Sequence, residues 1–272
     1  MNLTGSSTPQ GFDPDFALNV ALPLCEAAYA VMQSDGARPS LPVGWEMTAV
    51  VTAGEGGMAK LAGLSRWRGD FHDCMAQEKD IFGLIGKNPD EKIAFVSFRG
   101  TQDAIDWEHN FEAVYEPYGF VQGAGDVHLG FHSVYKALRA SVIGGLQEAA
   151  ADCDHVFVTG HSLGGALAVL AGLDVAVNTA AKQIPKLLTF AGPRAGLLEF
   201  HRDFNNLIPI CYRVVASGDL VPHVPLFVPP LFLYEHVGVE VKVDGGQDDD
   251  PIKAHNLEDS YLPGLKKLQA AS

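Results

Sequence analysis

The chain has 272 residues, of which 47% are hydrophobic and 19% are charged, so its composition is that of a globular protein and not of a disordered one. Its formal net charge is −14, from 33 acidic and 19 basic residues, which argues against nucleic-acid phosphates as partners and against electrostatic attraction to anionic membranes. The charge does not argue against an apolar substrate at a lipid–water interface.

The first residues lack the features of a secretory signal. The first basic residue is Arg38, and residues 1–7 contain no apolar core. We therefore expect a cytoplasmic protein or a chain without its leader. No transmembrane helix is expected, because the apolar stretch 163–173 is too short to span a bilayer and the stretch 220–234 is interrupted by prolines.

The N-terminal part predicts a loose arm over residues 1–12, followed by a helix and a strand. Apolar residues recur at helical spacing over 13–33, and Pro23 is expected to kink that helix. A strand is expected over 46–53, whereas the pattern over 54–80 gives no assignment. The cysteines form no C-x-x-C pair, and we expect buried free thiols, with one disulfide as the alternative. They are Cys25, Cys74, Cys153 and Cys211.

From residue 92 onward, short apolar runs typical of buried strands alternate with helical patterns. The expected strands cover residues 92–98, 156–160, 186–191, 211–216 and 237–243. The expected helices cover residues 131–150, 163–178 and 195–206, and a last helical segment that His255 opens. Loops are expected over 115–125 and 220–233. This alternation predicts a single α/β domain over residues 1–272 with a largely parallel central sheet flanked by helices.

Ser162 lies at the corner between an expected strand and an expected helix, within Gly160-x-Ser162-x-Gly164. A strand that turns sharply into a helix needs little bulk two residues before and after the corner, and glycine meets that need. The serine oxygen would then point out of a strained turn at a helix N-terminus, which favours negative charge. The alternative is an ordinary turn with a surface serine; the flanking strand and helix favour a nucleophile.

A serine nucleophile needs a general base, and the base needs a carboxylate on its other nitrogen. In one arrangement of this triad the residues follow in the order Ser, Asp or Glu, His, after the ends of strands. Asp219 directly follows an expected strand, whereas Asp203 lies inside a helical pattern. The acids at 244 and 248–250 lie in a loop expected to be solvated, with a calcium site as a weaker alternative.

Three histidines follow Asp219 and could supply the base. His255 follows the last expected strand and its loop, so we rank it first. His223 is only four residues after Asp219 and ranks second, and His236 leads directly into a strand and is expected to be structural. For the oxyanion hole, we expect the backbone N–H of Leu163 and, from the loop after strand 92–98, the N–H and hydroxyl of Thr101.

Several motifs, in this order, resemble those of the class 3 lipase family, the group of the filamentous-fungal triacylglycerol lipases. The resemblance covers about residues 91–262 and includes Trp107, at the position of a lid tryptophan, and Tyr234-Glu235-His236-Val237-Gly238, whose histidine is not catalytic in the family. Five further segments carry it. They are Phe98-Arg99-Gly100-Thr101 (FRG[ST]), Val127-His128-Leu129-Gly130-Phe131 (VHxGF), Gly160-His161-Ser162-Leu163-Gly164-Gly165 (GHSLGG), Thr189-Phe190-Ala191-Gly192-Pro193-Arg194 (TFGxPR), and Arg213-Val214-Val215 through Asp219 to Pro225 (RVV…DxVPxxP).

The resemblance implies an α/β-hydrolase fold and a carboxylic-ester hydrolase that cleaves acyl esters such as acylglycerols through an acyl-enzyme. It implies Ser162, Asp219 and His255 as the triad, Thr101 with Leu163 as the oxyanion hole, no metal or organic cofactor, and a mobile lid at about 102–113. That segment is polar for a lid that binds a lipid interface.

Alternatives remain at this stage. Phospholipase A1 and feruloyl-type esterase activities occur in the same family, and a serine peptidase or thioesterase would use the same chemistry. A catalytically silent module that binds an apolar ligand or partner is the alternative from another class. The sequence indicates no oligomeric state.

Overall fold

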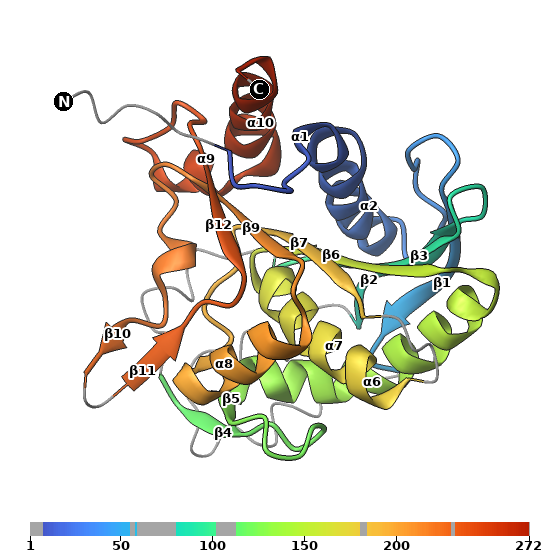
Figure 1. Ribbon diagram of the computed structural model, residues 1–272. Coiled ribbons are helices and arrows are strands. Elements are labelled where there is room, and N and C mark those ends of the chain that lie inside the picture. The colour runs from blue at the N-terminus through green and yellow to red at the C-terminus, as the bar shows by residue number, and fades with distance from the viewer. Residues whose placement is uncertain are drawn as a thin grey trace.

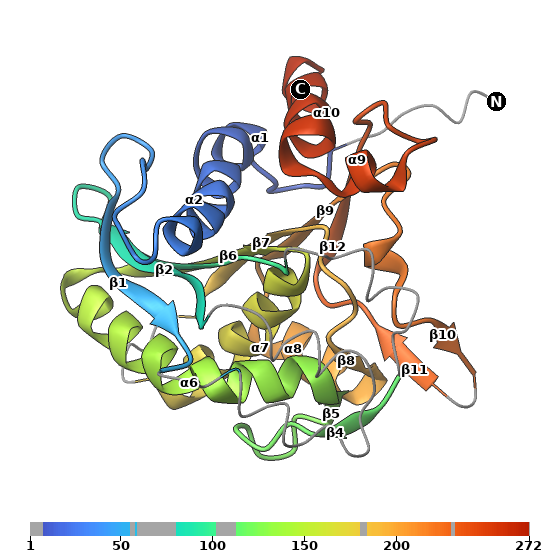
Figure 2. The same ribbon diagram turned by 180° about the vertical axis from the view of Figure 1, so that it is seen from behind.

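A computed structural model describes residues 8–54, 58, 80–101, 113–179, 184–229 and 232–271. In these residues, helices cover both faces of a central sheet, with α1, α2 and α10 on one face and α6, α7 and α8 on the other (Figure 1, Figure 2). The sheet has the strand order β1-β2-β3-β6-β7-β9-β12. Its strands are β1 (Glu46–Thr52), β2 (Ile81–Asn88), β3 (Ile93–Phe98), β6 (His155–His161), β7 (Lys186–Phe190), β9 (Cys211–Ala216) and β12 (Val239–Val243).

The pairing of these strands confirms the largely parallel sheet. From β3 to β12 every neighbouring pair is parallel, and only β1–β2 and β2–β3 are antiparallel. Parallel strands end at the same edge, so the segments that follow β3, β6 and β9 meet there. This edge is the place where ligands bind in open α/β sheets.

Strand β2 was not predicted, and its glycines explain why. Gly83 and Gly86 interrupt its apolar run, and glycine weakens a strand pattern. A side chain at Gly86 would place its Cβ 2.0 Å from the Glu46 carbonyl oxygen of the neighbouring strand. The residue that obscures the strand in the sequence therefore permits the close approach of β1.

The helices confirm the expected segments with small shifts. They are α1 (Pro14–Phe16), α2 (Leu22–Gln33), α6 (Leu129–Ala149), α7 (Leu163–Asn178), α8 (Leu198–Leu207), α9 (Pro251–His255) and α10 (Leu262–Ala270). A π-helical turn, Ala17–Ala21, joins α1 to α2, whose second residue, Pro23, lacks the N–H that a regular α-helix would use there. Another π-helical turn, η5 (Leu257–Tyr261), joins α9 to α10.

The N-terminal helical segment Pro14–Gln33 is apolar and long enough to span a membrane, the one helix of this kind in the described ranges. Half of its most apolar window is buried inside the fold, where Ala17, Leu24 and Val31 pack with residues of the sheet. Residues 1–7 of the expected loose arm lie outside the described residues, and near its other end Phe12 packs edge-on against Tyr212. The apolar face of this segment therefore covers the sheet.

Three short segments differ from the expectations. The expected loop 115–125 begins with a strand, β4 (Tyr115–Pro117), and the loop 220–233 contains a 3₁₀ turn (Val221–His223) and enters two strands. These strands form a second sheet of order β10-β11-β8-β5-β4 with β10 (Phe227–Val228), β11 (Phe232–Glu235), β8 (Gly196–Leu197) and β5 (Asp126–His128). His255 ends α9 and does not open a helix. Strands of two to four residues are too short to show an alternating pattern.

Of the four cysteines, three lie in the described ranges. Cys25, Cys153 and Cys211 are buried free thiols, as expected, and Cys74 lies outside the described residues. Burial raises the pKa of the Cys25 and Cys211 thiols to about 12, so both stay protonated and unreactive at neutral pH.

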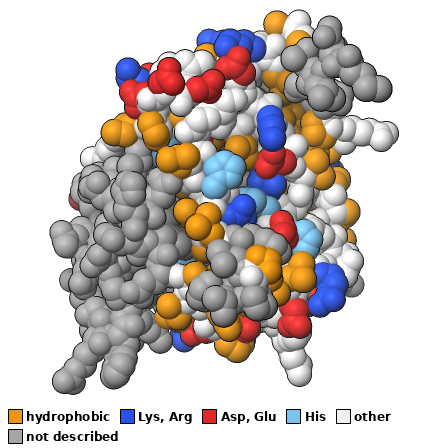
Figure 3. Space-filling view, turned by 90° about the vertical axis from the view of Figure 1, so that its left-hand side faces the viewer, with side chains coloured by type: hydrophobic (Ala, Val, Ile, Leu, Met, Phe, Trp, Pro, Cys, Tyr) orange, Lys and Arg blue, Asp and Glu red, His pale blue; other side chains and the backbone are white. Residues whose placement is uncertain are grey.

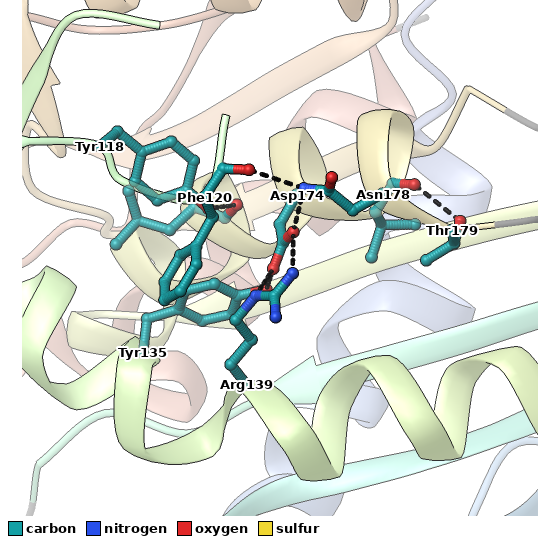
Figure 4. Close-up of polar contacts among 9 residues, drawn as sticks. Tyr118, Phe120, Tyr135, Arg139, Asp174, Asn178 and Thr179 are labelled. Carbon is teal, nitrogen blue, oxygen red and sulfur yellow. Dashed lines mark hydrogen bonds and ion pairs between the residues drawn. The ribbon is translucent and has the colours of Figure 1, made fainter. Parts of the chain in front are cut away.

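A buried carboxylate joins α6 to α7 (Figure 4). Asp174 of α7 has no exposed surface and accepts hydrogen bonds from Tyr135 (2.7 Å), from Arg139 (2.7 and 3.0 Å) and from Asn178 (2.7 Å). The Arg139 guanidinium also lies 4.4 Å from the centre of the Phe120 ring. These donors offset the cost of burying the charge.

Replacing Arg139 should therefore destabilise the protein. Arg139→Met keeps the aliphatic stem but leaves a buried carboxylate without its cation, and we expect a loss of about 3 kcal/mol in the free energy of unfolding by urea denaturation. Asp152→Asn, which removes an exposed partner of Lys87, is the control and should change stability little. Equal effects of the two substitutions would contradict this account.

His236 is buried and hydrogen-bonded, as expected for a structural histidine. Its lowered pKa makes the free energy of unfolding depend on pH. Its Nε2 lies 2.6 Å from the Pro222 carbonyl oxygen, and burial together with the Arg213 charge lowers its pKa well below 6.5. The unfolded chain then binds one more proton than the folded protein below pH 6.5, so stability falls as the pH drops through that value.

We expect His236→Gln, which keeps a side-chain N–H, to reduce the slope of unfolding free energy against pH between 6.5 and 5. The reduction can reach about 1.4 kcal/mol per pH unit, the full contribution of one proton. Urea denaturation across this range measures the slope, with the exposed His155→Gln as control. An unchanged slope in His236→Gln would rule out a neutral buried His236.

Candidate active site

Ser162 lies at a strained corner between β6, which ends at His161, and α7, which begins at Leu163. Its backbone has φ 59° and ψ −129°, a conformation that costs a residue with a side chain of the order of 1–3 kcal/mol. The corner is held on both sides: the Ser162 N–H donates to the Phe190 carbonyl (3.0 Å), and the Ser162 carbonyl accepts from Gly165 (2.8 Å). This is the geometry of a nucleophile elbow.

The two glycines of the motif are required by close contact, as the sequence predicted. A Cβ at Gly160 would lie 2.2 Å from the Gly164 carbonyl oxygen, and a Cβ at Gly164 would lie 2.3 Å from the Phe98 carbonyl oxygen. At the end of β3, a Cβ at Gly100 would lie 2.7 Å from the Ser162 Cβ. The loop that carries Thr101 therefore runs directly beside the candidate nucleophile.

The structure brings Asp219 and His255 together. His255 Nδ1 lies 3.0 and 3.1 Å from the two carboxylate oxygens of Asp219, and both side chains are buried. Asp219 follows β9, and its carboxylate also accepts from the Tyr261 hydroxyl (2.5 Å) and the Val221 N–H (3.0 Å). A carboxylate fixed by these two other donors holds the imidazole of His255 with its proton on Nδ1, which leaves Nε2 as the acceptor.

Two buried polar atoms at this site have no hydrogen-bond partner among the described residues: Ser162 Oγ and His255 Nε2. Buried polar atoms without partners are rare, and each calls for an explanation. The two atoms therefore do not bond to each other in this structure. The hydrogen bond between a serine nucleophile and its base is often long without substrate and tightens in the substrate complex, which leaves both atoms available to a reacting group.

The remaining predicted positions are placed as follows. Thr101 is buried directly after Gly100, and Leu163 is the first residue of α7, where the backbone N–H groups are not used by the helix itself. Their role as oxyanion donors stays a prediction. His223 is exposed on the turn after Asp219, so the first-ranked His255 is the histidine that meets the carboxylate. The lid expected at 102–113 lies outside the described residues apart from residue 113.

Tyr261 of the site was not predicted. Burial and the neighbouring Asp219 charge raise its pKa well above 10, so it remains a hydroxyl donor to that carboxylate. It lies 42 residues after Asp219 and on a π-helical turn, a relation that local spacing does not show. Tyr29 and His161 also reach the site. Within the described ranges, no group of three His, Cys, Asp or Glu side chains could hold a metal ion.

Comparisons with known proteins find lipases and a phospholipase among the relatives of this chain. The family model described as "Lipase (class 3)" matches residues 95–228. Lipase ZK262.3 of Caenorhabditis elegans is 34% identical over 175 residues, which cover 62% of this chain and 48% of that protein. Phospholipase A1-II 3 of Oryza sativa subsp. indica is 28% identical over 222 residues, covering 69% of this chain and 52% of that protein.

A solved structure, lipase II from Rhizopus niveus, superposes with a TM-score of 0.53 at 32% identity and covers 58% of this chain and 60% of that chain. The chain spans about half the length of the curated relatives it matches. Its seven-stranded mixed sheet with helices on both faces is the α/β-hydrolase fold. The matched segment, the relatives and this fold together show that the chain belongs to the class 3 lipase family.

Proposed function

We propose that this protein is a serine carboxylic-ester hydrolase that cleaves acyl esters such as acylglycerols through an acyl-enzyme. The observation that carries the proposal is the buried His255, bound through Nδ1 to Asp219 while its Nε2 and the hydroxyl of Ser162 have no partner in the described part of the chain. The strained backbone of Ser162 supports the same role.

The proposed reaction assigns one task to each residue. His255 Nε2 takes the proton of Ser162 as the serine oxygen attacks the ester carbonyl, and Asp219 stabilises the imidazolium that forms. The oxyanion accepts hydrogen bonds from the Leu163 N–H, at the N-terminal end of α7, and from Thr101, in the loop after β3. The alcohol leaves with the proton from His255, and water, deprotonated by the same nitrogen, then hydrolyses the acyl-enzyme.

Exposed apolar side chains close in sequence to Asp219 and His255 support an acyl substrate. Leu220 is 45% exposed directly after Asp219, Leu226 is 63% exposed, and Ile252 is 67% exposed on the short helix that ends at His255. Figure 3 shows hydrophobic side chains interspersed with histidine, basic and acidic side chains over one face of the molecule. A relative named phospholipase A1 makes phospholipids the second candidate substrate class.

Substitution of the triad tests the proposal. We expect Ser162→Ala and His255→Ala to lower kcat on a p-nitrophenyl ester by about 10⁶-fold and Asp219→Asn by about 10⁴-fold, while the circular dichroism spectrum is unchanged. Only the wild type should be labelled stoichiometrically by an organophosphate. His223→Ala is the matched control and should stay active. An active His255→Ala with an inactive His223→Ala would show that the base is misassigned.

Substrate chain length distinguishes a lipase from an esterase. Because the expected lid segment is polar, we expect the initial rate to favour short to medium acyl chains and to saturate below the solubility limit. The measurement is initial rate against concentration for acetyl to palmitoyl esters, across each solubility limit, with Ser162→Ala as blank. A rate that rises steeply once an emulsion forms, with palmitoyl preferred, would instead identify a lipase activated at interfaces.

A further inference from the structure

A chain of hydrogen bonds joins the loop beside Ser162 to the backbone of His255. The Tyr29 hydroxyl of α2 lies 2.9 Å from the Gly100 nitrogen and 2.8 Å from His161 Nδ1. On the other side of the imidazole, His161 Nε2 lies 2.9 Å from the His255 carbonyl oxygen. Three segments far apart in sequence, α2, the end of β6 and α9, therefore meet through two side chains.

The direction of each bond follows from which atoms can donate. The His255 carbonyl oxygen only accepts, so His161 Nε2 carries the proton and Nδ1 is an acceptor. The Gly100 N–H only donates, so the Tyr29 oxygen accepts from it and gives its own proton to His161 Nδ1. Burial and the neighbouring His255 lower the pKa of His161 well below 6.5, which keeps this imidazole neutral.

The way in which α2 packs explains why Tyr29 reaches His161. The Thr159 hydroxyl of β6 donates to the Leu188 carbonyl (2.7 Å), so the Cys25 thiol, 3.3 Å from the Thr159 oxygen, is the donor in that contact. Four residues along a helix rise about 6 Å, and two residues along a strand about 6.6 Å. The step from Cys25 to Tyr29 therefore matches the step from Thr159 to His161, and α2 follows β6 to the site.

We propose that Tyr29 and His161 are positioning residues that hold His255 and the Gly100–Thr101 loop in fixed relation to Ser162. The proposal rests on the proposed hydrolase function. Asp219 fixes the imidazole of His255, and His161 fixes its backbone, so the base is held at two points. Tyr29 lies outside the residues matched by the family model, and a misplacement of about 1 Å in such a site can cost about 100-fold in rate.

Removal of one oxygen atom tests the role of Tyr29. Tyr29→Phe should lower kcat on a soluble p-nitrophenyl ester about 10- to 100-fold and change KM less than about twofold, because the acyl group still binds while the reacting groups shift. The matched control is Tyr118→Phe. The buried Tyr118 hydroxyl donates to the Leu170 carbonyl of α7 (2.7 Å), on the face of the sheet opposite α2. This variant loses a hydrogen bond of the same kind and should keep the wild-type kcat.

Variants of His161 test the same chain from its other end. His161→Gln keeps an N–H for the His255 carbonyl and should retain more activity than His161→Leu, which keeps none. The double variant Tyr29→Phe with His161→Leu should be no slower than His161→Leu alone, because both changes break one chain. This non-additivity would not arise from two unrelated losses of stability.

The outcomes separate this proposal from the function on which it rests. A wild type that neither turns over esters nor reacts with an organophosphate defeats the hydrolase proposal. An active wild type in which Tyr29→Phe equals Tyr118→Phe, or in which the rate losses at Tyr29 and His161 simply multiply, overturns the positioning role. Thermal unfolding of every variant, measured alongside, shows whether a rate loss accompanies a folded protein.

Discussion

The strained backbone of Ser162 determines how closely the end of β6, the start of α7 and the end of β3 approach one another. A residue with a side chain adopts this conformation only when its surroundings over-determine it. Here β7 accepts the Ser162 N–H, α7 begins at once, and the glycines at 160 and 164 remove the atoms that would otherwise collide. The same closeness brings the end of β3 against the corner, so the loop that is expected to bind the oxyanion adjoins the nucleophile for steric reasons.

Two buried carboxylates, Asp174 and Asp219, have similar surroundings but different roles: the first joins two helices, and the second binds the proposed catalytic histidine. Asp174 is surrounded by donors from α6 and α7. Asp219 is also fully paired, with a tyrosine hydroxyl, a backbone N–H and His255. What differs is the partner: Arg139 ends the first network with a fixed charge, whereas His255 ends the second with a nitrogen, Nε2, that has no partner among the described residues. A neutral imidazole can accept a proton, and a guanidinium cannot.

Sequence reasoning succeeded where the signal is local. The parallel strands β3, β6, β7 and β9 are continuous apolar runs because both of their faces are buried. The order of Ser162, Asp219 and His255 along the chain follows the order of segments at one sheet edge, and their catalytic roles stay a prediction. The strands that were not predicted are those in which a residue is chosen for a contact with a segment distant in sequence, or which are very short. Glycines hide β2 because β1 approaches them, and the strands of the second sheet are too short for a period.

The supporting tyrosines could not be predicted for a related reason. Tyr261 and Tyr29 are ordinary members of helical patterns, and their hydroxyls reach Asp219 and the Gly100 N–H only because η5 and α2 pack against the sheet. The lid expected at 102–113 stays a prediction, as do the oxyanion roles of Thr101 and Leu163.

The N-terminal helical segment is far from Ser162 in sequence but reaches its surroundings in space through Tyr29. It precedes the matched family residues, yet its apolar face covers the sheet and its buried turns bond to β3 and β6 through Ser97 and Thr159. Such contacts fix the rotation of α2 about its axis as well as its distance from the sheet, since a hydrogen bond is directional and apolar packing is not. With the rotation fixed, one turn further along the helix places Tyr29 over His161. Packing that stabilises the fold thus also determines where the polar groups around Ser162 lie.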